Sequence, residues 1–409
     1  MTISRADAAQ LDRTDELAFV RARFALPEDV IYLDGNSLGP LPKTTPGRLA
    51  EVIEREWGAR LIRSWNEAGW WTASQRVAAR LAPLLGARAE EIMVADSTSV
   101  NLFKLLVIGA RLRPGRPVIV VERHAFPTDV YLANSVVDLI GGELRLIDEP
   151  AELDAVLDER VGLVCLSQVD FRTGAMWNAA DTTARVHEFG ALMLWDLCHS
   201  AGALDVELAA WGADLAVGCG YKYLNGGPGA PAFCYVAEKL HKNVRTPLPG
   251  WHGHADPFAM SPTYVPAEGI GQLANGTPPM LSLLALEDAL GAFADVPAVA
   301  LRRKGIALTS LFIDLIDERC PELAVASPRE ADRRGSQVSL RNEHAYGLVA
   351  ALIERGVIGD HRSPDIARFG FPPSYVRFVD VWDAVEVIVD TLTSGDHRAS
   401  RFSVRPTVT

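Results

Sequence analysis

The chain has 409 residues, of which 48% are hydrophobic and 22% charged, a balance typical of a folded globular protein and not of a disordered one. Its formal net charge of −12 argues against general binding to nucleic acid, although it leaves room for a local basic pocket around an anionic ligand. No apolar stretch reaches the roughly 20 residues that a membrane-spanning helix needs, so we expect no membrane span.

The cysteines show neither a disulfide framework nor a metal-ligand spacing. Their number is odd, and the charged N-terminus lacks the apolar core of a secretory signal. Both features favour reduced thiols and a cytoplasmic location. The five cysteines are Cys165, Cys198, Cys219, Cys234 and Cys320.

The first 24 residues predict a single amphipathic helix. A short apolar run follows and breaks into Gly, Asn and Pro in IYLDGNSLGPLP (31–42), which predicts a strand and then a loop. Residues 45–85 have helical spacing, with a tryptophan-rich interruption at Trp65, Trp70 and Trp71. The apolar members expected for the first helix are Leu11, Leu17, Phe19, Val20 and Phe24.

From Glu91 onward, short apolar runs alternate with amphipathic stretches. Strands that are buried on both faces and separated by helices predict a mainly parallel α/β sheet. In such sheets the ligand binds beyond the C-terminal ends of the strands, among the strand-to-helix loops. The seven predicted strands are IMVA (92–95), PVIVVE (117–122), LRLID (144–148), VGLVCLSQ (161–168), ALMLWD (191–196), ADLAVGCG (213–220) and GAPAFCYV (229–236).

The run at 280–293 predicts a long helix that leads out of this region. Beyond it the pattern is helix, strand and helix again, which predicts a smaller α+β domain. We therefore expect an N-terminal segment (1–50) that packs with the small domain, a large domain (51–293) and a small C-terminal domain (294–409).

Two segments carry the strongest chemical signal, WDLCHSAGAL (195–204) and GCGYKYLNGGPG (218–229). Asp196 closes an apolar strand, and Lys222 follows another apolar run. A carboxylate that pairs with a pyridinium nitrogen and a lysine that forms an imine are the pair that pyridoxal phosphate requires. Burial beside a cationic ring would lower the pKa of the lysine and make it a nucleophile and base. Taken separately, Asp196 is also explained as a helix cap, and Lys222 as a surface residue.

A hydroxyl-rich loop, ADSTSVNLFKLL (95–106), joins a predicted strand to a predicted helix. Its residues Asp96, Ser97, Thr98 and Ser99 and the free N–H groups of the first helical turn would cradle a phosphate. The alternative is an ordinary Ser/Thr helix cap.

Two more strand-to-helix loops hold candidate ring contacts. In ERHAFPTDVY (122–131), Phe126 is placed to stack on a planar ring and Asp129 to bond a ring substituent; alternatively they are a core residue and a helix cap. In LSQVDFRTG (166–174), Ser167 ends a strand and would meet the ring or its phosphate, unless nearby backbone satisfies its hydroxyl.

This succession of a phosphate turn, a stacking aromatic, an Asp-x-x-His segment and a late lysine is similar to that of fold-type I pyridoxal enzymes. Within that class the chain resembles the kynureninase family, from about residue 31 to 293 and more weakly to Arg368. The motifs are YLDGNSLGPLP, SVNLFKLL, FPTD, DLCHSAG, GYKYLNGGPGAP and GWHGH. The resemblance implies the aspartate-aminotransferase-like fold and pyridoxal 5'-phosphate as cofactor.

The resemblance also implies roles for individual residues. Lys222 would hold the cofactor, Asp196 would bond its ring nitrogen, and Phe126 would stack on the ring. From the neighbouring subunit of a homodimer, Trp251 and Thr277 would complete the phosphate site. Further cofactor contacts are implied for Thr98, Ser99, Ser167, His199 and Tyr221, and substrate contacts for Trp65 and Arg368.

The implied reaction is the hydrolysis of L-kynurenine, or of 3-hydroxykynurenine, to an anthranilate and L-alanine in tryptophan catabolism. Lys222 would remove the α-proton, and Tyr221 would act as general acid or base, with Tyr223 as the alternative. Arg368 would hold the α-carboxylate. Competing arginines for that role are Arg362 and Arg377.

Several alternatives stay open. His199 is also explained as a structural histidine, and Trp65 as part of a core or interface. We expect no metal site, because His252 and His254 have no third ligand. Other functions on the same fold are an aminotransferase, a cysteine desulfurase, for which Cys320 is the only late cysteine, and a cofactor-free binding protein.

Overall fold

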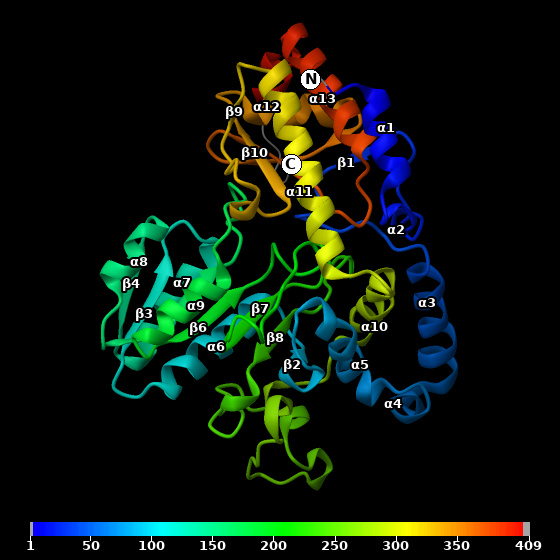
Figure 1. Ribbon diagram of the computed structural model, residues 1–409. Coiled ribbons are helices and arrows are strands. Elements are labelled where there is room, and N and C mark those ends of the chain that lie inside the picture. The colour runs from blue at the N-terminus through cyan, green and yellow to red at the C-terminus, as the bar shows by residue number, and fades with distance from the viewer. Residues whose placement is uncertain (1–2, 404–409) are drawn as a thin grey trace.

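A seven-stranded sheet forms the centre of the larger part of the structure, a computed structural model that describes residues 3–403 (Figure 1). The strand order is β2-β8-β7-β6-β5-β3-β4; β8 runs antiparallel to β2 and β7, and the other neighbouring pairs are parallel. The predicted, mainly parallel sheet is thereby confirmed. Its strands are β2 (Ile92–Val94), β3 (Val118–Glu122), β4 (Glu143–Ile147), β5 (Val161–Ser167), β6 (Leu192–Asp196), β7 (Leu215–Gly218) and β8 (Phe233–Val236).

Both faces of this sheet are covered by apolar side chains. In β3, Val118 and Val120 belong to one buried cluster, whereas Ile119 and Val121 belong to another. Successive side chains of a strand point to opposite faces, so a strand covered on both sides reads as a continuous apolar run. The helices over the two faces are α6 (Thr98–Leu112) and α7 (Pro127–Ile140) on one side, and α5 (Ala73–Leu81) and α9 (Ala179–Glu188) on the other.

The parallel strands end side by side. Ser167, the last residue of β5, is the direct register partner of Asp196, the last residue of β6. Asp196 is in turn paired with Val217 in β7, five residues before Lys222. The pairing register therefore places the polar residues of three separate loops along one edge of the sheet.

A second, antiparallel sheet has the order β12-β13-β10-β9 and lies above the first in Figure 1. With its helices it forms the predicted smaller α+β part. Its strands are β9 (Ala324–Val325), β10 (Gln337–Arg341), β12 (Asp360–Arg362) and β13 (Ile366–Gly370). Its helices are α11 (Ala298–Arg319), α12 (Ala345–Glu354) and α13 (Phe378–Ser394).

The N-terminal segment contacts this smaller part. Strand β1 (Ile31–Tyr32) pairs in parallel with β11 (Val357–Ile358), and Arg5 forms an ion pair with Asp383 at 2.7 Å. The expected domain boundaries at residues 50 and 293 stay a prediction, and the outer ranges extend beyond the described residues.

The prediction of one N-terminal helix is wrong. Helix α1 (Arg5–Thr14) is followed by its C-cap residue Asp15 and then by a short α2 (Ala18–Arg21). The Asp15 carboxylate accepts the N–H of Leu17 at 2.9 Å and pairs with buried Lys304 at 2.7 Å, which favours the break. Two of the five predicted apolar members are exposed, Leu11 by 40% and Phe19 by 48%, whereas Leu17, Val20 and Phe24 are buried.

The helical stretch at 45–85 is interrupted, as predicted. Helix α3 (Thr45–Glu51) continues as a wide-turn segment to Arg60, and Gly69, with a φ of 66°, precedes the turn at Trp70. The helix predicted at 280–293 is α10 (Met280–Ala289) followed by a 3₁₀ turn to Phe293. None of the described helices is long and apolar enough to cross a membrane. The remaining short helices are α4 (Ser64–Glu67) and α8 (Leu153–Val156).

Candidate active site

Two buried carboxyl groups lie at the carboxyl edge of the large sheet. The Asp196 carboxylate accepts the N–H of Cys198 at 2.8 Å, and Ser167 donates to the Asp129 carboxylate at 3.3 Å. Burial raises the pKa of Asp196. Burial and then the charge of Asp196 raise the pKa of Asp129 well above its ordinary value. Two carboxyl groups in such surroundings favour a cationic partner between them.

Lys222 lies in the loop after β7, next to these carboxyl groups. Its Nζ is 3.0 Å from Nε2 of His199, three residues after Asp196. Burial disfavours the lysine's charge, but acidic neighbours, Cys219 first, outweigh it and raise the pKa of Lys222. Burial and then the charge of Lys222 lower the pKa of His199 well below its ordinary value. His199 is therefore neutral at pH 7 and accepts a hydrogen bond from the lysine.

The lysine loop is fixed from the other side by the N-terminal segment. The N–H of Gly39 donates to the carbonyl of Tyr221 at 2.8 Å. A Cβ added at Gly39 would lie 2.4 Å from the carbonyl oxygen of Lys222, so no residue larger than glycine fits there.

The hydroxyl-rich loop before α6 forms the expected helix start. The Ser97 side chain accepts the N–H of Val100 at 3.4 Å, while Thr98 and Ser99, in the first turn, offer N–H groups without intrahelical partners. Asp96 has a φ of 54° and pairs with the buried ammonium of Lys104 at 2.8 Å. A cavity of about 450 Å³ opens here, lined in part by Thr98 and Tyr221.

The aromatic candidates differ in accessibility. Phe126 is 49% exposed and makes an edge-to-face contact with Phe171, with ring centroids 5.5 Å apart. Burial raises the pKa of Tyr221 to about 12, and the Lys222 ammonium lies 5.9 Å from its ring centre. Tyr223 is buried, and its hydroxyl donates to the carbonyl of Ser336 at 3.4 Å.

These residues fit pyridoxal phosphate. The cofactor needs an amine to bind, a carboxylate for its ring nitrogen, and donors for a phosphate. The structure offers Lys222 beside buried Asp196 and Asp129, and the open N–H groups at the start of α6.

Arg368 on β13 is 1% exposed and held on several sides. Its guanidinium donates to both carboxylate oxygens of Asp360, with the Nε contact at 2.7 Å, and to the Ser37 hydroxyl at 2.9 Å. It also donates to the carbonyl of Phe171 in the loop after β5. The competing Arg362 shares the Asp360 carboxylate at 2.6 Å, whereas Arg377 pairs with Asp380 at the start of α13.

Two predicted site residues, Trp65 and Trp251, lie in a separate aromatic cluster. Trp71 contacts both Trp65 and Trp251, with ring centroids 6.1 Å apart in each pair. Thr277 is exposed. Among the described residues, no hydrogen bond or ring contact joins Trp65, Trp251 or Thr277 to Lys222 or Asp196 within this chain.

Two residues of the smaller part have site contacts that the sequence did not predict. Gln337 bonds His199, and Asp360 holds Arg368. Gln337 is 138 residues from its partner, and neither residue belongs to a recognisable motif. Only the packing of β10, β12 and β13 against the strand ends reveals them.

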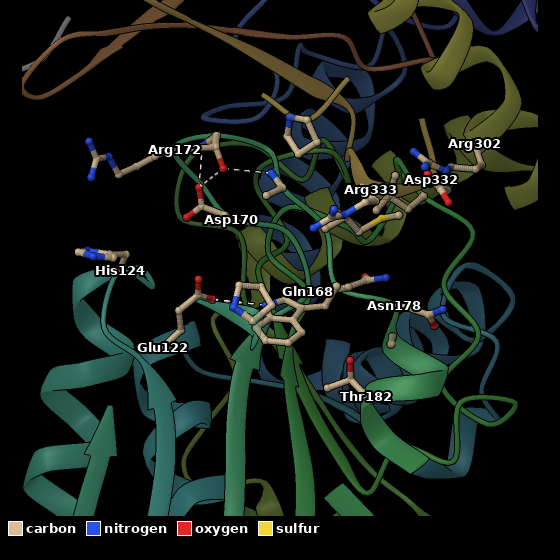
Figure 2. Close-up of a pocket in the computed structure, with 18 of the residues that line it drawn as sticks. Glu122, His124, Gln168, Asp170, Arg172, Asn178, Thr182, Arg302, Asp332 and Arg333 are labelled. Atoms are coloured by element: carbon tan, nitrogen blue, oxygen red, sulfur yellow. Dashed lines mark hydrogen bonds between the residues drawn. The ribbon is translucent and has the colours of Figure 1, made fainter. Parts of the chain in front are cut away.

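A larger cavity of about 780 Å³ lies next to this edge, between the ends of β3 and β5 and residues of the smaller part (Figure 2). Glu122 lines it and accepts the indole N–H of Trp177 at 3.4 Å. Burial and then the charge of Asp170 raise the pKa of Glu122 to about 7. Between about pH 4.5 and pH 7, the folded protein therefore keeps a proton on Glu122 that the unfolded chain has already released.

Replacing Glu122 by Gln is expected to stabilise the protein at pH 8 by about 1–2 kcal/mol, because the fold disfavours the ionised carboxylate. The gain is limited because the Glu122 side chain stays partly accessible to water. Stability of the unmodified protein should fall as the pH rises from the ordinary glutamate pKa of 4.5 to about 7. Urea unfolding at pH 5 and pH 8 checks this. The variant's advantage should shrink at pH 5. An equal effect at both pH values would contradict the prediction.

Comparisons with known proteins identify the relatives of this chain. Residues 301–388 match the family model of the kynureninase C-terminal domain. Kynureninases from Pseudomonas fluorescens and Burkholderia mallei (strain SAVP1) are each 49% identical over 414 residues, which cover 99% of this chain and 100% of the relative.

Solved structures with this fold include the apo cysteine desulfurase from Thermococcus onnurineus NA1, with a TM-score of 0.79 at 19% identity over 92% of this chain and 98% of that chain. The cysteine desulfurase CsdA from Escherichia coli has a TM-score of 0.78 at 20% identity over 93% and 99% of the two chains. A C-DES variant with glycine linked to its pyridoxal phosphate has a TM-score of 0.78 at 17% identity, covering 90% and 98%.

The fold and the lysine–carboxylate edge define the class of fold-type I pyridoxal-phosphate enzymes, with the aspartate-aminotransferase-like fold. Within that class, identity over nearly the whole length decides the family. The chain belongs to the kynureninase family. Among the described residues, no group of three or more His, Cys, Asp or Glu side chains is arranged to hold a metal ion.

Proposed function

We propose that this chain is a pyridoxal-phosphate-dependent hydrolase that cleaves the Cβ–Cγ bond of L-kynurenine, giving anthranilate and L-alanine. The observation that carries the proposal is the contact between Lys222 and His199 beside buried Asp196. That arrangement occurs in a chain 49% identical to kynureninases over its whole length.

We assign the cofactor-binding residues by their surroundings. Asp196 would pair with the protonated ring nitrogen, with Asp129 and Ser167 next to it. Phe126 would cover a ring face. Around the phosphate, the first turn of α6 supplies Thr98 and Ser99, and Tyr221 lines the same cavity.

Pyridoxal phosphate, when bound, supplies an electron sink for charge that leaves the substrate's α-carbon. Lys222 removes the α-proton, and the neutral His199 accepts a hydrogen bond from the resulting ammonium. Tyr221, whose pKa is raised to about 12, stays protonated at neutral pH and donates to the oxygen of the γ-carbonyl. Tyr223 is less suited, because its hydroxyl is used in the core.

Arg368 binds the substrate's α-carboxylate in this proposal. Asp360 and Ser37 orient its planar guanidinium. A carboxylate bound there would fix the orientation of the substrate and therefore of its scissile bond. Trp65 would face the aromatic ring of the substrate.

We further propose a homodimer in which Trp251 and Thr277 complete the partner's phosphate site. The aromatic cluster around Trp251 continues into strongly exposed apolar side chains, Phe258 at 67% and Met260 at 77%. Exposed apolar patches of this kind mark interaction surfaces. A cytoplasmic location also stays a proposal, in keeping with five unpaired cysteines.

A cysteine desulfurase is less well supported. That reaction needs a reactive cysteine on a mobile loop, whereas Cys320 is buried at the end of α11. Burial also raises the pKa of Cys320 to about 11, which disfavours the nucleophilic thiolate.

The test is the visible absorbance of the purified protein before and after addition of L-kynurenine, with anthranilate fluorescence followed in parallel. We expect a cofactor band that shifts on addition while anthranilate appears. A band without anthranilate would keep the cofactor but reject the substrate. No band even after incubation with pyridoxal phosphate would reject the enzyme and favour a cofactor-free binding protein.

Asp196→Asn is expected to lower kcat by about 10²–10³-fold, because an amide cannot stabilise a protonated ring nitrogen as a carboxylate does. The variant should still bind the cofactor, since Lys222 and the phosphate turn are intact. Steady-state kinetics combined with the visible spectrum check both points. The matched control is Asp154→Asn, an exposed residue that pairs with Arg185. Unchanged kcat in Asp196→Asn would remove this residue from the mechanism.

A further inference from the structure

Gln337, at the start of β10, links the smaller part of the structure to the lysine. It is fully buried. Its Oε1 lies 2.9 Å from Nδ1 of His199, and its Nε2 donates to the carbonyls of Asp170 at 3.2 Å and Phe171 at 3.0 Å. A single amide side chain thus contacts the residue that bonds Lys222.

The orientation of this amide is determined by its surroundings. A carboxamide has an acceptor side and a donor side. With the amide reversed, its oxygen would face the carbonyl oxygens of Asp170 and Phe171 and would itself lack a donor, while these two carbonyls would keep only the Gly174 N–H and the Arg368 guanidinium. The Gln337 oxygen therefore points at His199, and Nδ1 of that ring must carry a proton.

The state of the other ring nitrogen follows. A neutral imidazole has one N–H and one bare nitrogen. With the proton on Nδ1, the Nε2 lone pair points at Lys222, 3.0 Å away. The buried position of His199 and the adjacent charges of Lys222 and Arg368 keep the ring neutral by lowering its pKa.

We infer that Gln337 is a positioning residue, which holds His199 in the Nδ1–H form and so presents an acceptor that orients the amino group of Lys222. The tautomer follows from the hydrogen bonds alone, whereas its effect on α-proton transfer rests on the proposed function. The Phe171 carbonyl is shared between Gln337 and Arg368, so the same loop also contacts the carboxylate-binding residue.

The experiment begins with the unmodified protein without cofactor, labelled with ¹⁵N in its nine histidines. Imidazole ¹⁵N shifts distinguish a protonated nitrogen from a bare one, and His199→Asn identifies the signal. We expect His199 to be protonated at Nδ1 and bare at Nε2 at pH 7.5. A signal with the proton on Nε2, or on both nitrogens, would overturn the inference whether or not Gln337→Met folds.

Gln337→Met then removes both the acceptor and the donor of the amide at nearly constant side-chain volume. We expect a mixture of the two His199 tautomers, an altered visible spectrum of the cofactor-loaded enzyme, and kcat lower by about tenfold. Gln272→Met is the matched control, because it also deletes a buried glutamine with two backbone partners. It should leave the His199 signals unchanged.

An unchanged tautomer in Gln337→Met would overturn the positioning role. Failure of the proposed function has a different signature, since the unmodified protein would then form no anthranilate while its histidine signals could still be measured.

Discussion

Lys222→Ala is expected to abolish the visible absorption of the cofactor-loaded protein and to lower kcat for L-kynurenine by about 10³-fold or more. The lysine is both the amine that binds the cofactor and the base that takes the α-proton in our proposal. Among the described residues, its amino group hydrogen-bonds only His199, so its removal should cost little folding stability. Absorption spectra, anthranilate fluorescence and thermal unfolding separate these effects.

The control is Lys239→Ala, which removes an exposed lysine that pairs with Asp214 at 2.8 Å. This variant should keep the visible band and the activity. If Lys222→Ala retained the band and formed anthranilate at a normal rate, another residue would have to hold the cofactor, and the site would be wrongly placed.

Arg368→Lys is expected to lower kcat/KM by about 10²-fold, mainly through KM, and to reduce the free energy of unfolding by about 1–3 kcal/mol. A lysine ammonium cannot reproduce the planar fork that contacts Asp360, Ser37 and the Phe171 carbonyl together. Burial alone would raise the pKa of Asp360, but the bonds from Arg368 and Arg362 hold it below its ordinary value. Steady-state kinetics and urea unfolding check the two expectations.

Arg362→Lys provides the matched comparison, because Arg362 shares the Asp360 carboxylate but is 33% exposed. Its effect on KM should be smaller than that of Arg368→Lys. The opposite order would make Arg362 the carboxylate-binding residue. Equal losses of stability with no change in KM for either variant would leave both arginines with a purely structural role.

Most strands of the large sheet were predictable because they are buried on both faces and therefore appear as uninterrupted apolar runs, as in β3 and β5, whereas the edge strand β4 is only partly buried. The N-terminal helix was not, because its break depends on a tertiary partner. Asp15 pairs with Lys304, almost 300 residues away, and no local pattern reveals that pair.

The same distinction applies to the site. Asp196 closes β6 and Lys222 follows its neighbour β7, while the phosphate turn follows β2, which is separated from β7 only by β8, so their proximity follows from sheet topology. Gln337 and Asp360 act through contacts between the two parts of the structure. Such contacts depend on how two independently formed surfaces meet, which composition and periodicity do not encode.

The pairing of β1 with β11 and the bond from Gly39 to the lysine loop have a consequence for biosynthesis. Residues 31–39 leave the ribosome early, yet β11 is made more than 300 residues later. The early segment must therefore wait, unpaired, until nearly the whole chain has been translated. Nascent chains that stop before residue 357 lack the strand that secures this segment, so a competent enzyme is a late product of synthesis.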